Sequence, residues 1–306
     1  MTLSSSNIDE AKPLYVAIEA GGTKFVVSVG NDWRNSVTST IATTTADETA
    51  AELIKFLRQQ IAGKRVAAIG VASFGPVGID PLSASYGVIG STPKPGWCGF
   101  SYRDVLKEFA APIVIDSDVN GAALAEARHG AGEGCRRVMY VTVGTGVGGG
   151  LVVDGCISNG SSHPELGHML LPRHKKDLVD AGYCPYHRDC LEGLASGPTV
   201  KARWGLDLSE LGSDHLGFEL QAYYLAAMST NIILQSVPDR IVLGGGVMQT
   251  QGLIEQVRIE TRALLNGYRP DLDSESAMAE LIQLPHHAPI SGLIGAFELA
   301  TDSVCS

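Results

Sequence analysis

The sequence lacks long apolar runs and an excess of basic side chains, and each absence removes a class of protein. No stretch of 18 or more apolar residues occurs, so we expect no membrane span. Lysine and arginine total 23 against 33 acidic residues, and the net charge of −10 argues against a nucleic-acid or anionic-membrane partner. Residues 1–13 are polar and lack the apolar centre of a signal peptide.

Cysteine is also scarce, and its spacing does not match a disulfide framework. The six cysteines stand at positions 98, 135, 156, 184, 190 and 305. Thiols without such a framework are typical of a reducing compartment. Together with the missing signal peptide, they predict a cytoplasmic protein.

No Walker A loop is present, and no G-x-G-x-x-G opens a helix in a βαβ unit. Three other glycine-rich turns each follow an apolar strand, at residues 21–22, 144–150 and 244–246. Glycine lets backbone N–H groups approach a phosphate, although hairpins also use glycine for steric reasons. Three such turns, with threonine hydroxyls at Thr23 and Thr145, favour a bound nucleotide.

The order of predicted elements repeats. Strands 14–19 and 25–30 flank a turn at 20–24, and strands 138–143 and 151–153 flank the turn at 144–150. The first half continues with strand 37–43, a helix capped by Asp47 and running to 61, strands 66–71 and 113–115, and helix 118–129. The second continues with helices 198–204 and 216–236, strand 240–243, helix 250–267, strand 280–284 and helix 291–301. This repetition indicates an internal duplication with a cleft between the halves.

A compact group of metal-binding residue types lies in the second half. Cys184, His187 and Cys190 form a C-x2-H-x2-C pattern, and His168 is the natural fourth ligand. The alternative is a pair of buried thiols and ordinary polar histidines. Four protein ligands would close a zinc site to water and make it structural. We expect this zinc to fix a loop that carries Glu165 and Glu192, on segments separate from the glycine turns.

Several motifs occur in the order found in the ROK family of sugar kinases, from residue 14 onward. They are residues 19–24, Asp118 to Asn120, 143–147, 165–168, 184–190 and 243–247. The chain looks most like the bacterial zinc-containing fructokinase branch, which it resembles at residues 73–77, 92–97 and 192–197 and in having Glu19 rather than aspartate.

The resemblance implies an α/β fold, the duplicated RNase-H-like (actin-like ATPase) fold with two domains and an interdomain cleft. Residues 1–117, completed by helix 291–306, would form one domain, and 118–290 the other, with the zinc loop. It also implies ATP with Mg²⁺, held by Gly21, Gly22, Thr23, Lys24, Gly144, Thr145, Gly146, Gly244, Gly245 and Gly246. Family members are often dimers, so a homodimer is an expectation.

The resemblance further assigns Asp118 as the general base. From the residues alone, a helix N-cap explains this aspartate equally well. Glu19 would hold Mg²⁺, and the candidate sugar ligands are Asn120, Glu165, His168 and Glu192.

The chain departs from the broad family pattern at two positions: Ser117 stands where many members have asparagine, and Glu19 where many have aspartate. Glutamate can still hold Mg²⁺ through water. The missing asparagine removes one expected sugar hydrogen bond and disfavours glucose. The sequence therefore predicts phosphorylation of D-fructose to fructose 6-phosphate. The alternatives are a mannokinase or glucokinase, or a non-catalytic sugar sensor, against which the retained Asp118 and glycine turns count.

Overall fold

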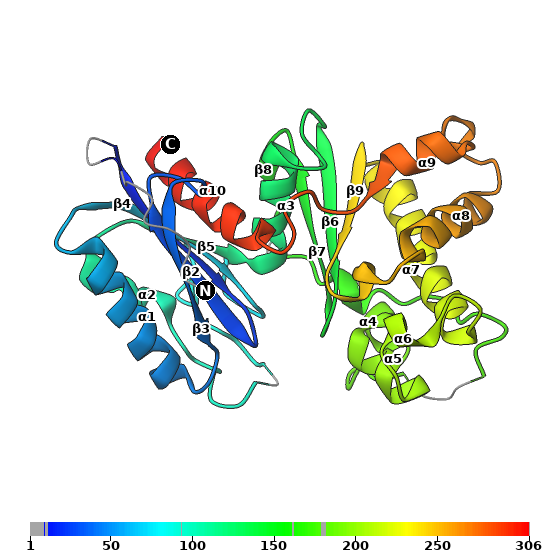
Figure 1. Ribbon diagram of the computed structural model, residues 1–306, viewed down its shortest axis with the longest axis horizontal. Coiled ribbons are helices and arrows are strands. Elements are labelled where there is room, and N and C mark those ends of the chain that lie inside the picture. Colours follow the sequence, from blue (N-terminus) through cyan, green and yellow to red (C-terminus); the bar gives the residue numbers. More distant parts are fainter. Residues whose placement is uncertain (1–8, 10–11, 93, 161, 179–181, 306) are drawn as a thin grey trace. The chain divides into compact units, whose positions relative to one another are not determined.

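The computed structural model describes residue 9 and residues 12–92, 94–160, 162–178 and 182–305 (Figure 1). Most of the predicted polar tail, 1–13, therefore lies outside the described residues. The chain divides into two compact units, the first of residues 1–125, 159–163 and 289–306, and the second of 126–158 and 164–288. The first unit thus continues past the predicted limit at residue 117, into helix α3 (Asp118–His129).

The first unit is built on a five-stranded sheet in the order β3-β2-β1-β4-β5. β1–β2 and β2–β3 pair antiparallel, and β4 and β5 run parallel to β1. The strands are β1 (Leu14–Ala20), β2 (Lys24–Gly30), β3 (Ser36–Ala42), β4 (Val66–Ser73) and β5 (Ile113–Ser117). The helices are α1 (Ala46–Ile61), α2 (Tyr102–Leu106), followed by a 3₁₀ turn (Lys107–Phe109), and α10 (Ser291–Cys305).

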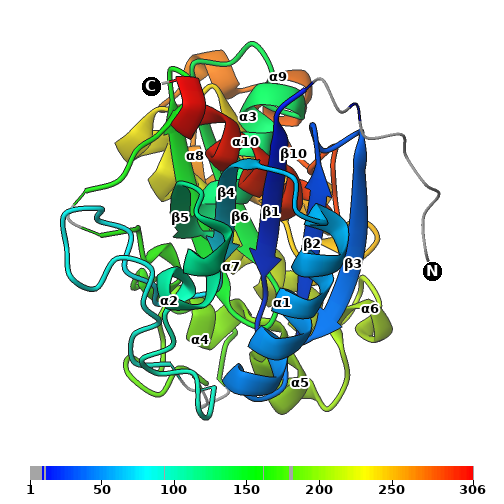
Figure 2. The same cartoon turned by 90° about the vertical axis from the view of Figure 1, so that its left-hand side faces the viewer.

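Alternation along β1 supplies both faces of this sheet, as the two-residue period of a strand requires. Val16 and Ile18 join the core under α1 that also holds Leu53 and Trp97. Tyr15 and neighbouring alanines turn the other way and pack against α10. Figure 2 shows α1 and α10 on opposite faces of the sheet. Both faces of β1 are therefore buried, which is why its sequence is apolar from Leu14 to Ile18.

The second unit repeats this sheet in the order β10-β9-β6-β7-β8. β6–β7 and β7–β8 pair antiparallel, and β9 and β10 extend the sheet in parallel from β6. The equivalence with the first sheet confirms the predicted duplication. The strands are β6 (Arg137–Val143), β7 (Val147–Val153), β8 (Cys156–Ile157), β9 (Arg240–Gly244) and β10 (Ile282–Gln283).

The helices of the second unit surround one core that includes Tyr224 and Leu225 of the long α7. Across the described ranges, no helix is both long and apolar enough to span a membrane. The helices are α4 (Leu191–Ala195), α5 (Gly197–Trp204), α6 (Leu208–Leu211), α7 (Leu216–Ser236), α8 (Leu253–Leu265) and α9 (Glu275–Leu281), with 3₁₀ turns at Leu166–His168, Val247–Gln249 and Pro270–Leu272.

Three local predictions were wrong. Thr45, not Asp47, caps α1, because its hydroxyl accepts from the backbone N–H of Glu48. Of the predicted strand 280–284, residues 280 and 281 end α9, and only 282 and 283 form a strand, β10. The glycines at 148–150 belong to β7 rather than to the turn, since they pair with residues 140–142 of β6.

Helix α10 approaches its neighbours backbone to backbone. A Cβ added to Gly70 of β4 would lie 1.9 Å from the carbonyl oxygen of Ala296, and one added to Gly295 would lie 1.9 Å from that of Gly121 in α3. No side chain fits at Gly70 or Gly295 without moving the helix. These contacts fix α10 to β4 and α3.

Candidate active site and metal centre

Asp118 is the first residue of α3 and follows directly on β5. The hydroxyl of Ser117 accepts from the backbone N–H of Asn120 at 3.2 Å, so Ser117 is the N-cap of the helix. Asp118 Oδ1 accepts from the N–H of Val119 at 2.9 Å, and the side chain is half-buried. The cap that explained Asp118 as a purely structural residue is therefore supplied by its neighbour.

Behind Asp118 lies a closed set of three polar side chains. Asn120 Nδ2 donates to Asp116 Oδ1 at 2.7 Å and to Asn159 Oδ1 at 2.8 Å, and Asn159 Nδ2 donates to Asp116 Oδ2 at 2.9 Å. Burial raises the pKa of Asp116, although these bonds oppose the shift. Asn120 is fully buried and its Oδ1 has no partner within the described part of the chain. Its amide hydrogens are thus committed inside the first unit.

Sequence reasoning missed Asp116 and Asn159. Asp116 was visible as the first residue of the Asp-Ser-Asp run at 116–118. Asn159 carried no signal, because it is 39 residues from Asn120 and stands in a polar loop.

Glu19, near the end of β1, is the second carboxylate of this region. Burial, and then the negative charge of Asp118, raise its pKa to about 7, while Lys24 and the N–H of Leu293 oppose the rise. Leu293 lies in the first turn of α10, whose N-terminus favours an anion. Two carboxylates in one region suit a hard cation such as Mg²⁺.

The first glycine turn joins β1 to β2 and exposes Gly22, Thr23 and Lys24. The ammonium group of Lys94 donates to the carbonyl oxygen of Gly22 at 2.6 Å and to that of Thr43 at 3.3 Å. Lys94 braces this turn and was not among the predicted residues. Its signal was its position as the one lysine of the 92–97 motif.

The second and third glycine turns lie side by side at the ends of β6 and β9. A Cβ added to Gly144 would lie 3.9 Å from Gly246 N. Gly245 has φ +91°, and a Cβ there would meet Val143 O at 2.3 Å, so this position requires glycine. The six predicted nucleotide-binding residues of these turns, Gly144, Thr145, Gly146, Gly244, Gly245 and Gly246, are thereby brought together.

The four predicted zinc ligands also come together. Their ligand atoms all lie within 4.8 Å of one another. Cys184 Sγ lies 3.6 Å from His168 Nδ1 and 3.9 Å from His187 Nδ1, and Cys190 Sγ lies 3.7 Å from His168 Nδ1. A tetrahedral zinc separates a sulfur and a nitrogen ligand by roughly 3.6 Å. The residues therefore fit zinc in both chemistry and spacing.

Burial disfavours the ionised form of the Cys190 thiol. Burial first, and then the neighbouring Cys184, raise the pKa of Cys190 to about 11. A bound cation would reverse this by stabilising the thiolates.

The two glutamates of the predicted sugar site lie on either side of the metal ligands in sequence. Glu165 is exposed and precedes the 3₁₀ turn that carries His168. Glu192 is in the first turn of α4, and its Oε2 accepts from the backbone N–H of Val147 at 3.0 Å. The zinc loop and the second glycine turn, expected on separate segments, are therefore in direct contact.

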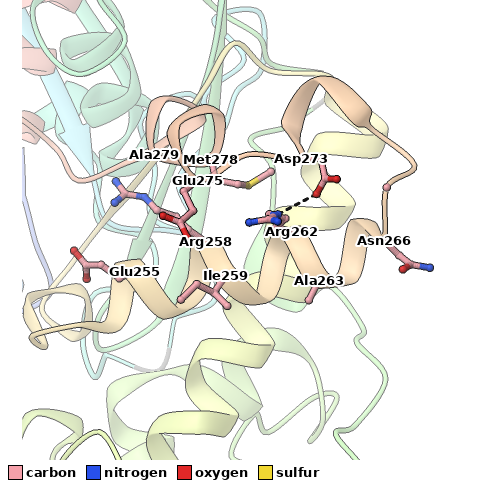
Figure 3. Close-up of a pocket in the computed structure, with 11 residues that line it drawn as sticks. Glu255, Arg258, Ile259, Arg262, Ala263, Asn266, Asp273, Glu275, Met278 and Ala279 are labelled. Atoms are coloured by element: carbon pink, nitrogen blue, oxygen red, sulfur yellow. Dashed lines mark hydrogen bonds and ion pairs between the residues drawn. The ribbon is translucent and has the colours of Figure 1, made fainter.

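A groove of about 910 Å³ lies elsewhere in the second unit, between α8 and α9 (Figure 3). Arg262 crosses it to Asp273, with a 3.0 Å bond from Nε to Oδ1, and Arg258 donates to the carbonyl oxygen of Ile282. Its lining contains none of the predicted site residues, and its arginines already have partners.

Comparison with known proteins identifies the family. A model of the ROK family matches residues 15–303. The chain belongs to the ROK family. It is 40% identical over 295 residues to a fructokinase of Zymomonas mobilis, covering 94% of this chain and 97% of the relative. It is 38% identical over 273 residues to a fructokinase of Lactococcus lactis, covering 89% and 91%.

Among solved structures, a ROK hexokinase from Thermus thermophilus matches with a TM-score of 0.77 at 27% identity, over 95% of this chain and 99% of that one. This match confirms the predicted fold, and the relatives confirm the resemblance drawn from the motifs. With such relatives over nearly its whole length, the chain is an ATP-dependent sugar kinase.

Proposed function

We propose that this kinase transfers the γ-phosphoryl group of ATP to the 6-hydroxyl of D-fructose, with Asp118 as the general base. The observation that carries the mechanism is the N-cap at Ser117, which frees the Asp118 carboxylate from a capping role. The fructokinase relatives support fructose as the acceptor.

Phosphoryl transfer needs an aligned hydroxyl, neutralised phosphate charge and exclusion of water. Asp118 would accept the proton of the attacking hydroxyl. Mg²⁺, when bound with ATP, would neutralise phosphate charge. Glu19, with its carboxyl group ionised, would hold the Mg²⁺. The first and second glycine turns, with Thr23, Lys24 and Thr145, would hold the phosphates. The third turn would hold the adenosine.

The sugar would be held by Glu165, His168 and Glu192, since carboxylates accept hydrogen bonds from neighbouring hydroxyls. His168 uses Nδ1 toward the metal cluster, which leaves Nε2 for the sugar. We assign Asn120 a supporting role, because its amide group is bonded to Asp116 and Asn159. Zinc would be structural, held by His168, Cys184, His187 and Cys190.

The location we propose is the cytoplasm. Cys98, Cys135, Cys156, Cys184 and Cys190 are free thiols, which suits a reducing compartment. The zinc cluster depends on two of them.

The test is a coupled ADP-release assay with ATP and Mg²⁺ across fructose, mannose, glucose and N-acetylated hexosamines. We expect fructose to give the highest kcat/KM. A tenfold preference for mannose or glucose would replace fructose with that sugar, and absence of turnover on every hexose would refute the kinase assignment. Asp118→Asn is the matched control, which should still bind ATP but turn over about 10²–10⁴-fold more slowly.

A further inference from the structure

We propose that the zinc centre sets the geometry of the second glycine turn, residues 144–147, through Glu192, which acts as a positioning residue for the phosphate-binding loop. The inference rests on the proposed function only in naming phosphate as what this turn binds. Under this proposal the zinc loop contributes to nucleotide binding as well as to sugar binding.

The first connection starts at the ligand Cys190. Cys190 is the N-cap of α4, and Glu192 is in the first turn of that helix. Glu192 Oε2 accepts from Val147 N at 3.0 Å and lies 2.7 Å from where a Cβ on Gly146 would be. Only Leu191 therefore separates a metal ligand from the residue that is bonded to the turn.

The second connection starts at the ligand His168. Its neighbour Gly167 is buried, and a Cβ there would lie 1.9 Å from Val147 O. The backbone of the 3₁₀ turn Leu166–His168 thus rests against the start of β7. Val147 is held on both sides, at its N–H by Glu192 and at its carbonyl by Gly167.

Further hydrogen bonds hold α4 in place, so that a shift of the metal ligands would move the second glycine turn. Ser196 N and Thr199 Oγ1 donate to the carbonyl oxygen of Glu192, at 3.1 and 3.2 Å. Gly197 N donates to Gly144 O at 2.8 Å, which fixes the other end of the turn. Residues 190–199 therefore contact the turn at Gly144 and at Val147.

Charge explains why Glu192 positions the turn rather than binding phosphate. A carboxylate repels phosphate oxygens, and it already uses the Val147 N–H, so that N–H is not a phosphate donor. What the carboxylate supplies is a fixed orientation of the turn, and that orientation depends on the metal holding Cys190 and His168 in place.

The first test measures hydrogen exchange of the peptide covering residues 144–150, which needs no activity. We expect slow exchange in the zinc-loaded wild type, and exchange at least tenfold faster after zinc removal or in Glu192→Ala. Glu192→Gln, which keeps an oxygen acceptor for Val147 N–H, should retain slow exchange. A peptide within β9, Arg240–Gly244, serves as the internal reference.

The second test measures ADP binding by calorimetry without sugar, for wild type and Glu192→Ala, each with and without zinc. Zinc removal should weaken ADP binding about tenfold in the wild type and by less than twofold in Glu192→Ala, because the link is already cut. Glu219→Gln, which removes only an exposed pair with Lys176, should behave as the wild type.

Unchanged exchange at 144–150 in Glu192→Ala and in the zinc-free protein would overturn the proposal. Equal losses of ADP affinity on zinc removal in wild type and Glu192→Ala would also overturn it. If zinc removal unfolds the chain, the zinc-loaded Glu192→Ala and Glu192→Gln variants still test the proposal. The difference in hydrogen exchange between them is measured without removing zinc. A wild type with the expected exchange pattern that binds no ADP would instead refute the proposed function.

Discussion

The hydroxyl of Ser117 caps the helix that Asp118 begins, with a 3.2 Å hydrogen bond from Asn120 N. The cap and the proposed general base are therefore adjacent residues. A substitution at position 118 can test the chemistry without removing the cap, which is worth about 1 kcal/mol.

Asp118→Asn should fold like the wild type and lose about 10²–10⁴-fold in kcat, the usual contribution of a general base. ATP affinity should change little, because the turns and the metal remain. Steady-state kinetics and a thermal melt measure the two effects. More than a third of wild-type kcat would show that another group accepts the proton.

Glu19→Gln should stabilise the protein at pH 8 without Mg²⁺. The folded-state pKa of Glu19 is raised from 4.5 to about 7, so the folded chain holds a proton that the unfolded chain releases between these values. Stability is then full below pH 4.5 and falls as pH rises through 7, by up to about 3 kcal/mol. Gln cannot ionise and avoids this loss.

Urea unfolding of both proteins at pH 4.5 and 8 measures the effect. The gain of Glu19→Gln over wild type should appear at pH 8 and vanish at pH 4.5, and a gain of equal size at both would refute the argument. Glu52→Gln, at an exposed position on α1, is the control.

Lys94→Met should raise the KM for ATP about tenfold, since a charged hydrogen bond contributes about 1.5–3 kcal/mol and this one holds Gly22. The control is Lys55→Met, which removes only an exposed pair with Glu52. Initial-rate kinetics at saturating sugar distinguish the two variants. An unchanged KM would mean that Lys94 does not order the first turn.

Metal analysis should find about one zinc per chain, and Cys184→Ser should lower this content and the melting temperature, since metal binding is coupled to folding of the loop. Cys156→Ser, at an exposed thiol of the same unit, should keep both. A fully active protein without zinc would make the spacing of the four ligands coincidental.

Arg203→Ala should destabilise the protein by about 3–5 kcal/mol, because it removes one partner of the buried ion pair between Arg203 and Asp177. Burial alone would raise the pKa of Asp177, but bonds from Tyr224 and Arg203 lower it. Because the pKa of Asp177 is lower in the folded than in the unfolded protein, its ionisation stabilises the fold when the pH is above the unfolded pKa, near 3.8. This stabilisation is lost as the pH falls through the folded pKa.

Lys201→Ala is the control for that experiment. It lies on the same helix and removes an exposed pair with Asp207, which contributes less than about 1 kcal/mol. Urea unfolding at pH 7 should separate the two variants clearly. Equal losses would mean that the Arg203–Asp177 pair does not stabilise the fold.

Local patterns predicted much of this molecule. Buried strands such as β1 and β6 contain apolar runs, at residues 14–18 and 138–141, and the metal cluster follows from four histidine and cysteine residues in a short stretch. The predicted strand at 280–284 was too long, because a short apolar segment suits a helix end and a strand equally well.

Contacts between distant segments were beyond local patterns. The bond between Glu192 and Val147 joins residues 45 apart, and that between Asn120 and Asn159 joins residues 39 apart. The spacing of residues along the chain predicts neither hydrogen bond, because both form only when the tertiary fold brings distant loops together.

The backbone contacts of α10 have a consequence for biosynthesis. Tyr15 near the start of the chain is covered by Phe297 and its neighbours near the end. A growing polypeptide therefore completes every residue of the second unit before the first unit can bury this face. The sheet of the first unit is therefore translated before α10, and its apolar face stays uncovered until α10 leaves the ribosome.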